Sequence, residues 1–440
     1  MIKNHDELHE ECGVVAIWGD DNAAQLTYYG LHSLQHRGQE AAGIVVRNNK
    51  RKLNIHKGEG LVSEVFDKEK IEKLSGNAAI GHVRYSTAGG GGIMNVQPFL
   101  FRTLDGMMGI AHNGNIVNAN LLKKELEENG SIFNSTSDTE VLGHLIKRET
   151  GRFVDRICKS LEKIDGAFAF VILVEDALYV ARDRYGLRPL SMGRLPSGGY
   201  MFSSETCALD IAGAEYVRDV EPGEIIRVKD GIIKSKKYTE TLPICNKLCA
   251  MEYIYFSRPD SNLDGINVHT ARKTCGKTLF EEAPIEADLV IGVPDSSISA
   301  AIGYSEASGI PYEMGLIKNK YVGRTFIQPT QEMRERGVRM KLSAVSSIVK
   351  GKRVIMIDDS IVRGTTSKRI VKLLKEAGAT EVHVRIASPA IKFPCFYGVD
   401  ISTLEELISH RMNVEELCQF IEADSLAFIS MEGLKKSVKH

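Results

Sequence analysis

The sequence predicts two domains of mixed α and β structure, and two patterns along its 440 residues support this. In the first half, short apolar runs alternate with turns, for example at 167–174, 178–181 and 224–228, which predicts a series of strands. In the second half, apolar strands lead through polar loops into amphipathic helices, as in a doubly wound α/β domain. The strand pattern lapses at 236–248, so we place the boundary there.

One stretch of the second half combines a strand, a polar loop and the start of a helix. The apolar run 354–357 predicts a strand buried on both faces, and Asp358 and Asp359 end it. A glycine and three hydroxyl residues follow where the helix would begin: Gly364, Thr365, Thr366 and Ser367. Backbone N–H groups there suit a phosphate, and the two carboxylates suit sugar hydroxyls or a divalent cation. The alternative is a solvated Asp-Asp turn with an N-capping threonine.

The order and spacing of this stretch resemble the phosphoribosyl-pyrophosphate (PRPP) loop of type I phosphoribosyltransferases. The resemblance implies that residues 364–367 bind the 5′-phosphate and that Asp358 and Asp359 bind the ribose hydroxyls. Ser296 follows another apolar strand, 288–293, and the resemblance places it at Mg²⁺ with both aspartates.

The basic segment 318–341 allows two interpretations that are compatible. It is an exposed loop, or it closes over PRPP, with Lys320, Tyr321 and Arg324 approaching the pyrophosphate and excluding water.

In the first half, a cysteine begins a strand, and four polar motifs follow it along the chain. Each motif contains glycine or a helix-capping residue. Cys12 starts the apolar run 12–19, which by itself predicts a buried cysteine. The motifs occupy 34–43, 81–87, 110–115 and 136–140. Each alone could be a turn or a helix cap, but four in this order are hard to assign to turns.

Together these motifs resemble the glutamine amidotransferase domain with an N-terminal nucleophile (Ntn) fold, an αββα sandwich, over residues 12–240. The resemblance implies that residues 1–11 are a propeptide and that Cys12 becomes the first residue. Its free α-amine, with a pKa of about 7.7–8.0, could then take the thiol proton. The resemblance assigns the oxyanion donors to Asn113 and Gly114.

The same resemblance assigns the residues that bind glutamine. Arg84 would pair with the α-carboxylate and Asp138 with the α-ammonium, while Arg37 and Thr87 would close the pocket. Neighbouring His36, His82 and His112 are interpreted as structural.

The block 249–261, with 265–269, extends the resemblance to nearly the whole chain, including a phosphoribosyltransferase domain at 249–440. The chain resembles the propeptide-bearing bacterial type of the amidophosphoribosyltransferase family. This implies an enzyme that hydrolyses glutamine and transfers the ammonia to PRPP, giving 5-phosphoribosylamine, glutamate and pyrophosphate in the first committed step of purine (IMP) biosynthesis. It also implies a homotetramer or homodimer inhibited by purine nucleotides. The alternatives are a non-catalytic scaffold with both folds and a glutaminase serving another acceptor.

In that bacterial type four cysteines hold a [4Fe–4S] cluster, and Cys249 and Cys395 match the first two. The closing pair would lie beyond His440, where this sequence ends. Since four thiolates are the usual requirement, either the cluster is lost or the sequence is truncated, and we expect no cluster.

Composition sets broad limits on the function. A net charge of −1 gives no global field for nucleic acid or a membrane surface. No run approaches the ~18 apolar residues of a membrane span, and the first residues lack the apolar core of a signal peptide. With eight scattered cysteines, these features predict a cytoplasmic protein.

Overall fold

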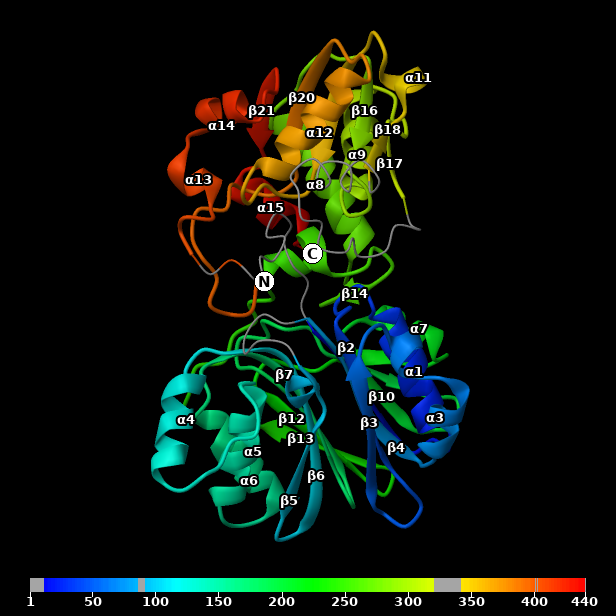
Figure 1. The fold of residues 1–440 in the computed structure, drawn as a ribbon, viewed down its shortest axis with the longest axis vertical. Helices are drawn as coiled ribbons and strands as arrows, with labels where there is room; N and C mark the ends of the chain where they lie inside the picture. The colour runs from blue at the N-terminus through cyan, green and yellow to red at the C-terminus, as the bar shows by residue number, and fades with distance from the viewer. Residues whose placement is uncertain (1–11, 86–91, 320–341, 400, 402, 440) are drawn as a thin grey trace.

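The computed structural model describes residues 12–439 except 86–91, 320–341, 400 and 402 (Figure 1). The expected propeptide at 1–11 and four predicted site residues, Thr87, Lys320, Tyr321 and Arg324, lie outside the described residues. Among the described residues, no helix has both the length and the apolar character needed to cross a membrane.

The first half forms two antiparallel sheets that stack face to face. In spatial order, the first sheet contains β11 (Glu215–Asp219), β9 (Ser191–Arg194), β10 (Tyr200–Ser203), β1 (Gly13–Trp18), β4 (Ala78–Arg84), β2 (Ala41–Arg47) and β3 (Leu53–Glu59). The second contains β13 (Ile232–Lys237), β12 (Glu224–Lys229), β8 (Leu178–Arg182), β7 (Gly166–Val174), β6 (Gly106–Ile116) and β5 (Phe99–Thr103).

Helices cover the outer face of each sheet (Figure 1). The first sheet carries α1 (Ala23–Ser33), α2 (Val62–Val65), α3 (Lys68–Lys73) and α7 (Thr206–Ile211). The second carries α4 (Ala119–Glu128), α5 (Thr139–Arg148) and α6 (Phe153–Glu162), and a 3-10 turn, η1 (Ile93–Asn95), precedes β5.

Strand β1 shows how the sequence builds these layers. Val14, Ala16 and Trp18 belong to the core between the sheets, whereas Val15 and Ile17 pack toward the helices. Successive side chains of a strand point to opposite faces, so a strand that is apolar throughout must be covered on both sides. The resulting αββα order confirms the predicted fold of this half.

The second half is built on a parallel sheet in the order β16 (Leu289–Gly292), β19 (Arg353–Asp358), β20 (Glu381–Ile386) and β21 (Ser425–Phe428). One face packs against α12 (Thr365–Glu376), α13 (Ile408–Arg411), α14 (Val414–Phe420), α11 (Ser346–Val349) and the hairpin β17 (Leu316–Lys318)–β18 (Leu342–Ala344). The other packs against α8 (Val268–Glu282), α9 (Ile298–Ser308) and α15 (Met431–Ser437).

Helices on both faces confirm the predicted doubly wound fold. The predicted strand at 354–357 is the buried centre of β19, and α12 begins at Thr365, where the sequence predicts a helix.

The two halves meet through the segment after β13, which includes a π-helical turn, η2 (Glu252–Phe256), and the small hairpin β14 (Asn262–Leu263)–β15 (Ile266–Asn267). Backbone hydrogen bonds run from this segment to residues of the first half, such as Lys247 N–H to Tyr185 O at 2.7 Å. The exact domain limits, 12–240 and 249–440, stay predictions.

Candidate active sites

Cys12 lies directly before β1, a central strand of the first sheet. Its Sγ donates to the carbonyl oxygen of Tyr85 at 3.5 Å. Burial raises the pKa of the thiol to about 11, although the Tyr85 contact and the positive charge of Arg84 oppose the rise. A cysteine here is therefore protonated at neutral pH and needs a base before it can act as a nucleophile.

Asn113 is fully buried on β6, beside the start of β1. The hydroxyl of Ser204 connects the two strands, since its Oγ accepts from Val14 N–H at 3.0 Å and lies 3.4 Å from Asn113 Nδ2. Among the described residues, Asn113 Oδ1 has no hydrogen-bond partner. A hydroxyl both donates and accepts, so Ser204 can bond to either the nitrogen or the oxygen of the Asn113 side-chain amide. The other atom of that amide is then left for a ligand.

Gly114 has a backbone conformation that requires glycine. Its φ is +138°, and a Cβ there would lie 2.0 Å from the carbonyl oxygen of Ala167. Glycine has no Cβ, so it can adopt this backbone conformation without the clash that any other residue would make.

Arg84 and Asp138 bring opposite charges to the surroundings of Cys12. Arg84 ends β4 and is buried, and its charge lowers the pKa of the Cys12 thiol, whereas Asp138 raises it. The carboxylate of Asp138 accepts from Ile116 N–H at 2.8 Å and lies 3.8 Å from His112 Nδ1. A cation and an anion near one thiol suit the carboxylate and ammonium groups of an α-amino acid.

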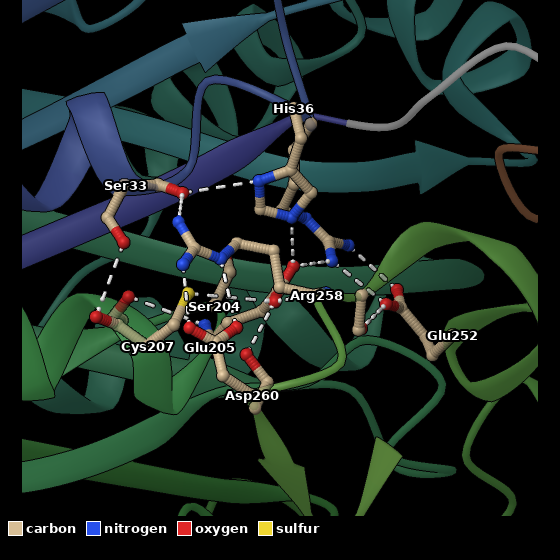
Figure 2. A network of polar contacts seen from close by, with 12 residues as sticks. Ser33, His36, Ser204, Glu205, Cys207, Glu252, Arg258 and Asp260 are labelled. Atoms are coloured by element: carbon tan, nitrogen blue, oxygen red, sulfur yellow. Dashed lines mark hydrogen bonds and ion pairs between the residues drawn. The ribbon is translucent and has the colours of Figure 1, made fainter. Parts of the chain in front are cut away.

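Arg37 has two partners that the sequence analysis did not foresee, the carboxylates of Glu205 and Glu252, both of which are labelled in Figure 2. Its side chain is fully buried and bonds to Glu252 through Nη1 at 2.9 Å and Nη2 at 2.8 Å. Nη1 also bonds to Glu205 at 2.7 Å, and Nε donates to the carbonyl oxygen of Cys12 at 3.2 Å. Burial alone lowers the pKa of Arg37, but the two carboxylates outweigh it and the pKa is raised. Its predicted part in a glutamine pocket stays a prediction.

The three neighbouring histidines have environments that suit structural roles. His36 Nε2 lies 2.7 Å from Glu205. Burial lowers the pKa of His82 to about 3, and it also lowers the pKa of His112. The latter two are therefore neutral at pH 7, and His82 is bonded through Nε2 to His112 O at 3.1 Å.

The second site lies at the carboxyl ends of β16 and β19, which are paired in parallel. Ser296 Oγ donates to Asp359, and Ser297 Oγ lies 3.2 Å from Asp358 Oδ1. Ser360 Oγ donates to the other oxygen of Asp359 at 2.7 Å. Burial raises the pKa of Asp359, although its contacts with Ser296 and Ser360 favour the ionised form.

The loop after β19 ends in a helix start that can bind an anion. Gly364 is the N-cap of α12 with a left-handed φ of 77°, and α12 is 12 residues long. Among the described atoms, Thr365 Oγ1 is buried with no hydrogen-bond partner. The helix N-terminus and this unpartnered hydroxyl lie in the segment predicted to bind phosphate.

The residues at the second site fit Mg²⁺. Asp358, Asp359 and Ser296 supply hard oxygen atoms, and a cation would relieve the unfavourable burial of the Asp359 charge. Among the described residues, no group of three or more His, Cys, Asp or Glu side chains could hold a metal. Mg²⁺ commonly binds through one or two carboxylates, with water and substrate phosphates completing its shell.

The described residues do not fit an iron–sulfur cluster. Cys249 and Cys395 pack against the same apolar cluster, and neither forms a disulfide. Within the described part of the chain, however, no third Cys, His, Asp or Glu joins them in a metal-binding group. An iron–sulfur cluster requires four ligands, so these two cysteines alone do not form a cluster site.

Several residues at these sites were not predicted from the sequence, among them Ser297, Glu205 and Glu252. Ser297 could have been found, since it follows Ser296 in the same loop. The contacts of Glu205 and Glu252 had no local signal, because Glu252 and Arg37 are 215 positions apart.

Comparisons with known proteins agree with this geometry. Residues 88–210 match the model of a glutamine amidotransferase domain, and residues 269–389 match that of a phosphoribosyl transferase domain. The amidophosphoribosyltransferase of Bacillus subtilis (strain 168) is 61% identical over 441 residues, covering 100% of this chain and 92% of that protein. The chain belongs to the amidophosphoribosyltransferase family.

Two further relatives support the same assignment. The family member of Staphylococcus aureus (strain Mu50) is 55% identical over 437 residues, which cover 99% of this chain and 88% of that protein. The solved structure of glutamine PRPP amidotransferase from B. subtilis, complexed with ADP and GMP, has a TM-score of 0.92 and 60% identity, covering 97% of this chain and 92% of the other. Family membership favours the enzyme over the non-catalytic scaffold.

Proposed function

We propose that this protein catalyses the glutamine-dependent conversion of PRPP to 5-phosphoribosylamine, with release of glutamate and pyrophosphate. This reaction is the first committed step of purine (IMP) biosynthesis. The observation that carries the proposal is that one chain, related over its full length to amidophosphoribosyltransferases, matches both a glutamine amidotransferase domain and a phosphoribosyl transferase domain. A glutaminase serving another acceptor would not need the second domain.

At the first site, glutamine is held by its charged ends and attacked at its side-chain amide. Arg84 pairs with the α-carboxylate and Asp138 with the α-ammonium. Cys12 Sγ attacks the amide carbon, after its proton has passed to the α-amine of the same residue. Asn113 Nδ2 and Gly114 N–H stabilise the resulting oxyanion. Ammonia leaves, and water then hydrolyses the thioester to glutamate.

This chemistry needs Cys12 to be the first residue, because the raised pKa of its thiol leaves it protonated at neutral pH. While residues 1–11 are attached, the nitrogen of Cys12 is an amide and cannot act as a base. We therefore propose that these residues are a propeptide.

At the second site, ammonia displaces pyrophosphate from C1 of PRPP. Residues 364–367 bind the 5′-phosphate through N–H groups and hydroxyls, and Asp358 and Asp359 orient the ribose hydroxyls. When Mg²⁺ is bound with the substrate, it neutralises charge on the departing pyrophosphate. Lys320, Tyr321 and Arg324 are proposed to approach that group.

Regulation, assembly and location are part of the proposal. We propose inhibition by purine nucleotides, supported by the relative whose structure was solved with ADP and GMP. We also propose a homodimer or homotetramer located in the cytoplasm.

The test replaces the proposed nucleophile, Cys12→Ala, in the full chain and compares two nitrogen sources. Glutamine-dependent formation of phosphoribosylamine should fall at least ~10³-fold, because the covalent step is lost. Synthesis from ammonia should continue, since it needs only the second site. Cys158→Ala, at a buried cysteine in α6, is the control and should change neither rate. Undiminished activity of Cys12→Ala with glutamine would show that the nucleophile is wrong.

A further inference from the structure

We propose that Glu252, which lies outside the amidotransferase half, is a positioning residue for Cys12 during glutamine hydrolysis. The inference rests on the proposed role of Cys12 as the nucleophile. It assigns a task to the buried ion network between the two halves of the chain, which the reaction described above does not use (Figure 2).

The contacts form a chain from Glu252 to the nucleophile. Glu252 accepts two nearly parallel hydrogen bonds from Arg37, at 2.8 and 2.9 Å. The third donor of the same guanidinium, Nε, reaches the carbonyl oxygen of Cys12 at 3.2 Å. A guanidinium is planar, so two bonds to one carboxylate fix the direction in which Nε points.

The carbonyl of Cys12 matters because it is attached to the same Cα as the thiol and the α-amine. If Arg37 and β1 together hold that carbonyl, rotation of the Cys12 backbone is limited, and with it the direction of both reacting groups. Misplacement of a reacting group by ~1 Å can cost about 10²-fold in rate. Loss of Glu252 should therefore affect the chemical step rather than the binding of glutamine.

Glu252 is itself held in place. Its side chain is fully buried in η2 and also accepts from Ser257 Oγ at 2.8 Å, while Arg188 Nη1 lies 3.5 Å away. Single π-helical turns often occur at functional sites. The carboxylate thus has two arginines and one hydroxyl around it.

Glu205 does not replace Glu252 in this task. It bonds to Arg37 through Nη1 alone, and its oxygens also serve His36, Ser261 and the N–H of Arg258. One bond to Nη1 leaves the guanidinium free to turn about that contact, whereas the paired bonds to Glu252 do not.

The experiment uses the full chain with Glu252→Gln, which keeps the shape of the side chain but removes its charge and one acceptor. The matched control is Asp264→Asn. Asp264 is also a carboxylate beyond the amidotransferase half, and it lies 3.6 Å from Arg182 Nη1 in the first half, so the control also removes a charge pair between the two halves. Asparagine tolerates the left-handed φ of 47° found there.

We expect Glu252→Gln to lower kcat with glutamine by about 10–100-fold, with the KM for glutamine within ~3-fold of the wild type. Synthesis from ammonia should stay within ~2-fold, and Asp264→Asn should stay within ~2-fold in every rate. Unchanged kcat with glutamine in Glu252→Gln would overturn the inference. An equal fall with glutamine and with ammonia would also overturn it, because that is the result of a general structural role.

Two further variants keep the test decisive. If Glu252→Gln does not fold, Ser257→Ala removes only the hydroxyl that holds Glu252, and kcat with glutamine should fall about threefold with KM unchanged. No change in kcat would contradict the inference. Cys12→Ala, assayed alongside, separates the two proposals: if it remains active with glutamine, the nucleophile is wrong, whatever Glu252→Gln does.

Discussion

The two candidate sites differ in how their residues are distributed along the chain. Among the described residues, the second site takes most of its groups from one continuous stretch, Asp358 to Ser367, and others from the loop after the adjacent strand β16. The first site collects single residues from strands and loops far apart in sequence, such as Cys12, Arg84 and Asn113. The proposed phosphate site at a helix start is a local structure, whereas the proposed amino-acid site depends on residues from both sheets of the sandwich.

The two sites also differ in the groups that stabilise their buried carboxylates. Beside the first site, Glu205 bonds to Arg37 and His36, and these contacts lower its pKa even though burial alone would raise it. At the second site, Asp359 is held by the hydroxyls of Ser296 and Ser360, and burial raises its pKa. The first arrangement is complete within the protein, but the second is suited to receive a cation with the substrate.

A large effect on synthesis from both nitrogen sources should come from removing the charge that this cation would balance. Asp359→Asn should lower synthesis by about 10²–10³-fold with both glutamine and ammonia, because metal-assisted charge stabilisation supplies several kcal/mol. Product formation at saturating PRPP measures this fall. Alkylation of Cys12 by iodoacetamide should keep its rate.

Asp288→Asn is the control for this variant. Asp288 lies before β16, at the opposite ends of the strands, where it bonds to Arg353 N–H at 2.8 Å. Its replacement should leave synthesis nearly unchanged. If Asp359→Asn slowed only the glutamine-dependent reaction, the distinction between the two sites would be wrong.

A smaller and more selective effect is expected at the first site. Gly114→Ala would place a Cβ 2.0 Å from Ala167 O, so the backbone must shift and the proposed N–H donor must move with it. Loss of one oxyanion donor costs about 10²–10³-fold in kcat, so glutamine-dependent synthesis should fall by up to that factor while the ammonia-dependent rate stays constant. Steady-state rates with each nitrogen source measure the difference.

Gly130→Ala is the control that separates the effect of backbone strain from the effect of moving the Gly114 N–H donor. Gly130 also has a positive φ, +84°, but a Cβ there would meet nothing within 4 Å. Equal losses of glutamine-dependent activity in both variants would argue against a role for the Gly114 N–H.

The same contrast explains what could be predicted from the sequence. The buried strand β19 and the start of α12 at Thr365 follow from local apolar patterns and spacing. The αββα layers were implied by the resemblance to a family. The set of residues around Cys12 came from resemblance to a family, because no local pattern places Arg84 beside a residue 72 positions earlier. The ion network of Arg37 was missed, since Glu205 lies 168 positions away in the sequence and the contact with Glu252 is set by how the two halves of the chain meet.

The smallest effect should appear at Thr365, whose Oγ1 is buried without a partner among the described atoms. Thr365→Val keeps the shape and removes the hydroxyl, so the protein without substrate should gain up to about 1 kcal/mol in free energy of unfolding. The KM for PRPP should rise about 5–10-fold, because a hydrogen bond to a phosphate is lost. Chemical denaturation and steady-state kinetics measure the two changes.

Thr27→Val, at another buried hydroxyl without a partner in the described structure, is the control and should gain similar stability without any change in the KM for PRPP. A rise in stability with unchanged KM in Thr365→Val would mean that this hydroxyl does not contact the substrate.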